Sequence, residues 1–349
     1  MTRPGPARAV TEPRPDTGSG IGDTPVRCLR VPLEGRAVRV WLKLEGENAY
    51  GSVKARTAHG LLAALEAGGR LRPRGHVVES TSGNLGIALA GLCRERGYRC
   101  TLVVDARTPA ASLDRMRSLG ADLVAVPWVP GGDTVPDRVA AVRRLLREVP
   151  GAVWTDQYGS PANPGVHARW TGPELARTVG CPRLDAVAAA VSTGGTLAGL
   201  ARYFRRHHPA TRILAVDAVG SAATGGAVLD RPLKLYGFGS GLRSQFLAPA
   251  DWDLLVRVND AHAALACRVV RDRTGLLLGG SAGAAVLAAA VTAARDPALV
   301  DVACLCPDGG ERYLAVIDGD VPREPALDPD GTAAGLDLLA SAELEPASG

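Results

Sequence analysis

Short apolar runs alternate along the chain with segments in which apolar residues recur every three or four positions. The runs have the length and composition of β-strands, and the periodic segments have the pattern of amphipathic helices. Strands are predicted at residues 38–44, 76–79, 101–104, 123–126, 152–155, 185–191, 212–216, 254–258 and 301–305. Helices are predicted to begin near Val53, Asn84, Ala111, Asp137, His167, Thr196, Ala261 and Gly283. Strands separated by helices favour an α/β fold with parallel sheets covered by helices, and nine strands favour two such sheets.

The two ends of the chain lack this pattern. Residues 1–20 are rich in Pro, Gly and Arg without periodicity, which predicts a mobile arm. Residues 321–349 are acidic, and their only helix-like stretch is at 336–344. Both ends are therefore expected to lie outside the folded core.

Composition narrows the class of protein. With 349 residues, 46% apolar and 22% charged, the chain can build about two domains and is neither a disordered polymer nor a disulfide miniprotein. No apolar run is long enough to span a membrane, and the seven cysteines form no CxxC pair. Forty basic against 36 acidic residues is a weak signal for nucleic acid. We expect a cytoplasmic protein without a metal site, membrane contact or nucleic-acid partner.

Only three of the 40 basic residues are lysines: Lys43, Lys54 and Lys234. Lys54 follows Ser52, a good N-cap, and precedes an apolar helical face, so it falls in the first turn of a helix. The positive end of the helix dipole disfavours an ammonium ion there, and enclosure would lower its pKa further. Such an amine is suited to Schiff-base chemistry, the alternative being an ordinary solvated lysine.

Two loops have the composition of anion-binding sites. Residues 79–86, ESTSGNLG, and residues 192–196, STGGT, each follow a strand and open a helix with hydroxyl groups and free backbone N–H groups. Either could be a simple helix cap. Neither is a G-x-G-x-x-G or P-loop motif, so a dinucleotide site is disfavoured. Residues 278–285, LGGSAGAA, and 307–313, PDGGERY, could be a close-packed turn and an ordinary loop.

In this order, the segments resemble the cysteine synthase and cystathionine β-synthase family of fold-type II pyridoxal phosphate enzymes, whose fold is like that of tryptophan synthase β. The resemblance runs from residues 21–25, IGDTP, to Tyr313. It implies two open, twisted, mostly parallel sheets, pyridoxal 5′-phosphate as cofactor, and a homodimer. It also implies a smaller domain at 48–160, a larger one at 21–47 plus 161–320, and closure that moves residues 84–150.

The family motifs assign roles to single positions. Residues 48–56 match N-P-x-G-S-x-K-x-R, which implies that Lys54 carries the cofactor as an internal aldimine. Asn84 is expected at the cofactor's 3′-oxygen and Ser281 at its pyridine nitrogen; a serine there favours loss of a β-leaving group over transamination. The cofactor phosphate is expected on Ser192, Thr193, Gly194, Gly195 and Thr196. The substrate carboxylate is expected on Ser80, Thr81, Ser82 and Gly83, with Gln157.

Within this family, residues 82–105, 237–246 and the Ser-Thr start of the phosphate loop resemble the N-(2-amino-2-carboxyethyl)-L-glutamate synthases of 2,3-diaminopropionate pathways. There O-phospho-L-serine supplies an aminoacrylate, which the nitrogen of L-glutamate attacks. The resemblance implies substrate contacts for Tyr158 and Arg138 and places the Ser192 hydroxyl near the nucleophile. An arginine near the leaving group would favour phosphate over acetate, and Arg243 is a candidate for that role. Ala49 in place of the usual proline and a bulkier loop at 237–241 leave the second substrate open.

Three other functions stay open at this point. A cysteine synthase would use O-acetyl- or O-phospho-L-serine with sulfide and would need no glutamate site. A serine or threonine dehydratase would release a keto acid without a second substrate. A non-catalytic binding protein would lack the colour of a lysine-bound cofactor.

Overall fold

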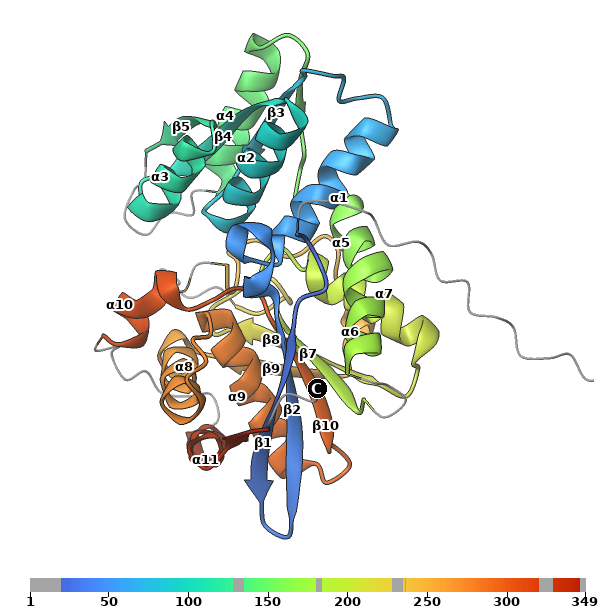
Figure 1. The fold of residues 1–349 in the computed structure, drawn as a ribbon, viewed down its shortest axis with the longest axis vertical. Coiled ribbons are helices and arrows are strands. Elements are labelled where there is room, and N and C mark those ends of the chain that lie inside the picture. Colours follow the sequence, from blue (N-terminus) through green and yellow to red (C-terminus); the bar gives the residue numbers. More distant parts are fainter. Residues whose placement is uncertain are drawn as a thin grey trace, which may run out of the picture.

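A computed structural model describes residues 20–127, 135–179, 184–227, 235, 237–319 and 329–345. The chain forms a smaller and a larger lobe, each built on one sheet, with helix α1 (Lys54–Ala67) between them (Figure 1). This confirms the predicted α/β class with two mostly parallel sheets.

The smaller lobe contains a four-stranded parallel sheet in the order β5-β4-β3-β6. Its strands are β3 (His76–Ser80), β4 (Arg99–Asp105), β5 (Asp122–Val126) and β6 (Ala152–Trp154). Helices α2 (Asn84–Arg96), α3 (Ala110–Ser118) and α4 (Val135–Glu148) connect them. Because the strands are parallel, the loop from β3 to α2 lies at the carboxyl edge of the sheet, where ligands bind in open α/β folds.

The larger lobe contains a seven-stranded sheet in the order β11-β1-β2-β10-β7-β8-β9. The strands are β1 (Val26–Leu33), β2 (Arg36–Leu44), β7 (Ala186–Ala190), β8 (Arg212–Ala218), β9 (Leu254–Val258), β10 (Asp301–Cys306) and β11 (Glu343–Leu344). From β2 through β10 to β9 every pairing is parallel, whereas β1 pairs antiparallel with both β2 and β11.

Helices cover both faces of this sheet (Figure 1). One face carries α8 (Asp260–Thr274), α9 (Gly280–Arg295) and α11 (Pro329–Ala340), with α10 (Leu314–Ile317) beyond α8. The other carries α5 (Ala162–Val166), a π-helical turn (His167–Thr171), α6 (Gly172–Thr178) and α7 (Gly195–His207). Short 3-10 turns lie at Glu45–Glu47, Ala49–Gly51, Pro249–Asp251 and Glu311–Tyr313. Separate apolar cores fill the two sides of the sheet.

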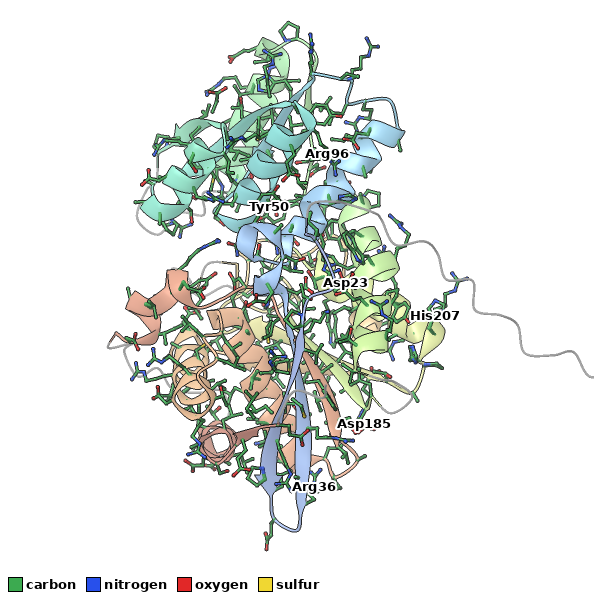
Figure 2. All side chains as sticks on the ribbon, viewed as in Figure 1. Asp23, Arg36, Tyr50, Arg96, Asp185 and His207 are labelled. Carbon is green, nitrogen blue, oxygen red and sulfur yellow. The ribbon has the colours of Figure 1, made fainter. Side chains whose placement is uncertain are left out.

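Tyr50 marks the waist where the two lobes meet (Figure 2). Its backbone has a φ of 67°, and a Cβ atom at Gly91 of α2 would come within 2.1 Å of its ring. Glycine at this position therefore lets the first helix of the smaller lobe approach the segment that precedes Lys54.

All nine predicted strands are present, but two others were missed. Strand β1 carries arginines and Pro32, which donates no backbone hydrogen bond and so weakens the strand pattern. Strand β11 has only two residues. The predicted arm at residues 1–20 lies outside the described residues except for Gly20.

The expectation that residues 321–349 lie outside the folded core is wrong for residues 329–345. Helix α11 packs on α8 and α9, and Leu339 is fully buried in the core of the larger lobe. A Cβ atom at Gly335 would come within 2.6 Å of the Val291 side chain, so the two helices are close. The predicted helical stretch at 336–344 begins earlier, at Pro329, and ends at Ala340.

The six cysteines in the described ranges are buried and free: Cys28, Cys93, Cys100, Cys267, Cys304 and Cys306. Cys181 lies outside those ranges. Across the part of the chain that the structure describes, no helix combines the length and apolar character needed to cross a bilayer.

Candidate active site

Lys54 is the first residue of α1, as the sequence predicted. The cap residue is Val53 rather than the predicted Ser52, yet the Ser52 hydroxyl still accepts a hydrogen bond from the Lys54 N–H at 3.3 Å. The Val53 N–H donates to the Pro307 carbonyl at 2.8 Å, which ties the start of α1 to the loop after β10. Burial lowers the pKa of the Lys54 amine, and the negative charge of Asp308 opposes that effect. The amine is therefore more readily deprotonated than that of an exposed lysine.

Residues 80–83 form a tight turn between β3 and α2. The Thr81 hydroxyl accepts hydrogen bonds from the N–H groups of Gly83 and Gly86 at 3.1 and 3.0 Å. The Ser80 hydroxyl is buried and has no hydrogen-bond partner among the described residues. A buried hydroxyl without a partner costs free energy, so the turn is suited to receive a polar ligand group.

Gln157 lies directly against this turn. Its side-chain Nε2 donates to the Ser80 carbonyl at 2.9 Å, and its backbone N–H donates to the Glu79 carboxylate at 3.0 Å. Asn163 Nδ2 donates to the Gln157 carbonyl at 2.7 Å and to the Thr193 hydroxyl at 3.4 Å. Asn163 thereby connects the predicted substrate loop to the predicted phosphate loop.

Arg138, in α4, contacts the backbone of the same turn. Its Nη1 donates to Asp105 Oδ2 at 2.7 Å and to the Thr81 carbonyl at 3.3 Å, and the side chain is almost fully buried. Tyr158 is half-buried beside Gln157, and the side chain of Arg243 is exposed. Direct substrate contacts of Arg138, Tyr158 and Arg243 stay predictions.

The phosphate loop has a backbone that only glycine accommodates at its centre. Gly194 has a left-handed φ of 87°, and a Cβ atom there would come within 2.1 Å of Ser244 Oγ, which donates to the Thr193 carbonyl at 2.7 Å. Gly195 begins α7, and its Cβ atom would meet Asn163 Oδ1 at 2.1 Å. The loop is thus held at the positive end of a 13-residue helix, where an anion is stabilised.

His167 supports this loop from the π-helical turn. Its Nε2 lies 3.3 Å from the Thr196 hydroxyl and 3.1 Å from the Thr57 hydroxyl. Burial lowers the pKa of His167 well below its usual range, and the positive charge of Lys54 acts in the same direction. The imidazole is therefore neutral at physiological pH. Ser192, at the start of the loop, is half-buried.

The loop after β10 joins the remaining predicted residues. Ser281 lies in the first turn of α9 and is 6% exposed. The Gly279 N–H donates to the Asp308 carbonyl at 3.1 Å. The Asp308 carboxylate accepts hydrogen bonds from Asn84 Nδ2 and the Tyr313 hydroxyl, each at 2.7 Å. Segments far apart in the sequence therefore meet around one loop.

Sequence reasoning missed four residues of this site: Glu79, Asn163, His167 and Asp308. Glu79 lies inside the segment at residues 79–86. Asp308 lies inside the segment at 307–313, which by itself could have been an ordinary loop. Their contacts join strands and helices that are distant along the chain, so no local spacing could reveal them.

The residues present fit pyridoxal phosphate. The buried Lys54 amine can bond to the aldehyde of the cofactor. The start of α7 can bind its phosphate, and the buried Ser80 hydroxyl, which has no partner among the described residues, can bind the amino acid substrate. Lys54 would hold the cofactor covalently, residues 192–196 its phosphate, and Asn84 and Ser281 its ring. No group of His, Cys, Asp and Glu side chains within the described ranges has the arrangement of a metal site.

The fold and the site together define a fold-type II pyridoxal phosphate enzyme. The family model described as "Pyridoxal-phosphate dependent enzyme" matches residues 18–307, and the chain belongs to that family. Its cofactor is therefore pyridoxal 5′-phosphate.

Individual relatives narrow the comparison. An N-(2-amino-2-carboxyethyl)-L-glutamate synthase from Ralstonia nicotianae is 40% identical over 86% of this chain and 88% of its own. A cysteine synthase from Staphylococcus aureus is 34% identical over 84% of this chain and 94% of its own. Among solved structures, an O-ureido-L-serine synthase matches with a TM-score of 0.78 and 30% identity, covering 87% of this chain and 95% of the other.

Proposed function

We propose that the protein joins an activated L-serine to L-glutamate: O-phospho-L-serine and L-glutamate give N-(2-amino-2-carboxyethyl)-L-glutamate and phosphate. In this β-replacement, the bond from Cβ to the phosphate oxygen breaks and a bond from Cβ to the glutamate nitrogen forms. The observation that carries the proposal is the 40% identity, over 86% of this chain, to a synthase named for that product. The Ser192 hydroxyl at the start of the phosphate loop agrees with it.

Lys54 has two roles in this proposal. Pyridoxal phosphate, when bound, withdraws electrons from the substrate Cα and so makes its proton removable. The Lys54 amine holds the cofactor before the substrate arrives and then takes the Cα proton. The lowered pKa of Lys54 favours the neutral amine that this second role needs.

The substrate carboxylate is assigned to the turn at residues 80–83. Its hydroxyl and N–H groups would hold the carboxylate, while Gln157 and Arg138 keep the backbone of the turn in place. Holding the carboxylate fixes the direction of the Cα–H bond toward Lys54. Tyr158 is assigned to the substrate and Arg243 to the leaving phosphate.

The larger-scale expectations belong to the same proposal. Residues 48–160 would form the smaller domain and residues 21–47 with 161–320 the larger, and closure on the substrate would move residues 84–150. The enzyme would be a cytoplasmic homodimer that takes small amino acid substrates. The two separate sheets and the position of α1 between the lobes support this division into two domains.

Mass spectrometry of the products tests the reaction. The purified holoenzyme is incubated with O-phospho-L-serine or O-acetyl-L-serine, each paired with L-glutamate or sulfide. A glutamate adduct from phosphoserine is expected. Cysteine as the only product would make the protein a cysteine synthase, and a keto acid as the only product would make it a dehydratase.

Lys54→Ala tests the central residue, with Arg117→Met, at an exposed side chain of α3, as the control. Lys54→Ala is expected to abolish both turnover and the visible absorbance of the lysine-bound cofactor. A variant at position 54 that keeps both would show that another lysine carries the cofactor.

A further inference from the structure

Asp308 connects the two lobes through one side chain. It follows β10 in the larger lobe, whereas its partner Asn84 begins α2 in the smaller lobe, 224 positions earlier. We infer that Asp308 is a positioning residue that fixes the orientation of the Asn84 side-chain amide toward the cofactor. The inference rests on the proposed assignment of Asn84 to the cofactor ring, and it does not depend on which amino acids are joined.

The chemistry of the two neighbours dictates which end of the amide faces which side. A carboxylate only accepts hydrogen bonds, so the Nδ2 end of Asn84 faces Asp308 Oδ2, at 2.7 Å. A guanidinium only donates, so the Oδ1 end faces Arg312, whose Nη1 donates to it. Both neighbours require the same orientation, so the amide has no reason to flip.

This orientation determines what Asn84 can offer a ligand. Nδ2 carries two hydrogens, and Asp308 takes one of them. The second is a donor for an oxygen of the cofactor ring, which the resemblance assigns to Asn84. A flipped amide would turn its carbonyl oxygen toward that ring oxygen, and two acceptors repel when the ring oxygen is deprotonated.

Asp308 is itself rigidly held. It is 5% exposed, and the Tyr313 hydroxyl donates to the same Oδ2 atom at 2.7 Å. A Cβ atom at Gly279 would come within 2.1 Å of Asp308 Oδ1, so glycine is needed there to leave room for the carboxylate. Burial raises the pKa of the Asp308 carboxyl, and the hydrogen bonds from Tyr313 and Asn84 oppose that effect.

A double-mutant cycle on cofactor affinity tests the inference. The dissociation constant of pyridoxal phosphate is measured by visible absorbance for the wild type, Asp308→Ala, Asn84→Ala and the double variant. Asp308→Ala is expected to weaken binding about tenfold, because a hydrogen bond involving a charged group is lost. In the Asn84→Ala background, the same change is expected to have almost no further effect. An undiminished loss in that background would overturn the inference.

Further variants separate positioning from folding. Asp308→Asn keeps an acceptor oxygen for Asn84 and is expected to recover most of the lost affinity; affinity as low as in Asp308→Ala would contradict the orientation argument. Glu311→Gln removes a neighbouring exposed carboxylate and is expected to bind the cofactor nearly as the wild type does. Melting temperatures of the cofactor-free variants identify any that fail to fold. The mutant cycle measures cofactor affinity and uses no amino acid substrate. If product analysis shows that the proposed reaction is wrong, the result of the cycle still stands.

Discussion

The buried carboxylate of Glu79, next to the turn at residues 80–83, accepts four hydrogen bonds. It accepts from the N–H groups of Ser80 and Gln157, the Trp154 indole and the Thr155 hydroxyl, at 2.5 to 3.0 Å. Burial nevertheless raises the pKa of Glu79 to about 7 from its usual value of 4.5. The folded chain therefore releases this proton at a higher pH than the unfolded chain does.

This shift makes the stability depend on pH. Below about 4.5 both states hold the proton; between 4.5 and about 7 the unfolded chain loses it first, so stability falls as the pH rises, and above about 7 the loss is complete. The total is about 3 kcal/mol. Glu79→Gln is expected to remove this part of the pH dependence, measured by urea unfolding at several pH values. Asp114→Asn, at an exposed carboxylate, serves as the control, and an equal pH dependence in wild type and Glu79→Gln would refute the assignment.

Ser192 is the residue that the proposed function ties to the second substrate. Ser192→Gly removes the hydroxyl at the start of the STGGT loop, and glycine accepts the backbone conformation there, so the loop should keep its shape. We expect the KM for L-glutamate to rise several-fold and the KM for O-phospho-L-serine to change less. Equal changes in steady-state assays of both substrates would make Ser192 a ligand of the cofactor phosphate only.

At the scale of elements, the start of α7 shows how one backbone conformation builds an anion site. Gly194 has a φ of 87° and contacts Ser244, which in turn bonds the Thr193 carbonyl. The left-handed residue turns the chain from β7 into the helix, so the N–H groups of its first turn are positioned to bind an anion.

Gly225 provides a matched control for Gly194, because it has the same φ of 87° but no atom within 4 Å of the position that a Cβ would take. Gly225→Ala is expected to lower the free energy of unfolding by about 1 kcal/mol without changing the affinity for pyridoxal phosphate. Gly194→Ala is expected to lower both, because its methyl group displaces Ser244. Chemical unfolding and cofactor titration distinguish them; equal affinities in the two variants would contradict this role for the Gly194 turn.

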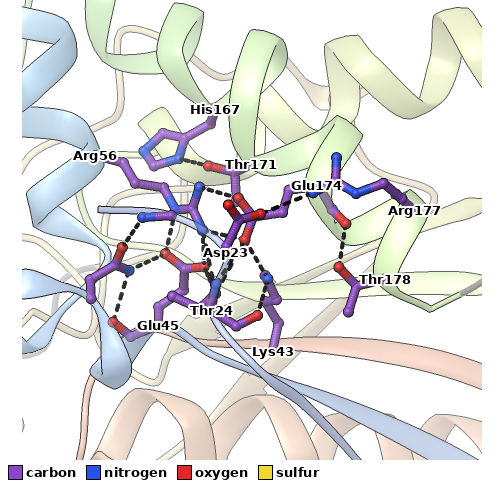
Figure 3. Close-up of polar contacts among 12 residues, drawn as sticks. Asp23, Thr24, Lys43, Glu45, Arg56, His167, Thr171, Glu174, Arg177 and Thr178 are labelled. Atoms are coloured by element: carbon purple, nitrogen blue, oxygen red, sulfur yellow. Dashed lines mark hydrogen bonds and ion pairs between the residues drawn. The ribbon is translucent and has the colours of Figure 1, made fainter. Parts of the chain in front are cut away.

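At the scale of the molecule, a buried set of charges joins the segments around Lys54 (Figure 3). Arg56 donates to both Glu45 and Glu174, and Lys43 donates to Glu174, with all four side chains at most 2% exposed. Thr24 accepts from Lys43 and donates to Glu45. The two positive and two negative charges balance, and they connect β2, α1 and α6 beneath the site.

Removing Arg56 takes the paired cation from the buried Glu45 and leaves Glu174 with Lys43. Arg56→Met is expected to lower the free energy of unfolding by about 3–5 kcal/mol. Arg117→Met, which breaks an exposed pair with Asp114, is expected to cost less than about 1 kcal/mol. Urea unfolding of both variants measures the difference, and similar losses would show that the buried set adds nothing beyond a surface pair.

Low pH weakens the same buried set of charges, because it protonates Glu174. The charges of Arg56 and Lys43 and their hydrogen bonds lower the pKa of Glu174 from 4.5 to about 2, although burial opposes them. The ionised Glu174 therefore stabilises the fold above pH 4.5, and this contribution is lost as the pH falls toward about 2.

Strands and helices followed from local pattern, because burial of one face imposes a period of two or 3.6 residues on any segment. The same pattern placed Lys54 at the start of a helix and the two hydroxyl-rich loops between a strand and a helix. It failed at β1, where arginines and Pro32 interrupt the apolar positions. It found part of α11 but did not predict that Leu339 is buried in the core.

By itself, the sequence determined the α/β class and the motif order, and it predicted which residues would hold the cofactor. Only the tertiary structure decided which groups support them: Asp308 against Asn84, His167 against Thr196, and Arg56 against Glu174. Each pair joins segments 29 to 224 positions apart. Local propensity fixes the conformation of a short segment, whereas such pairs exist only after distant segments have packed and excluded water from the charges between them.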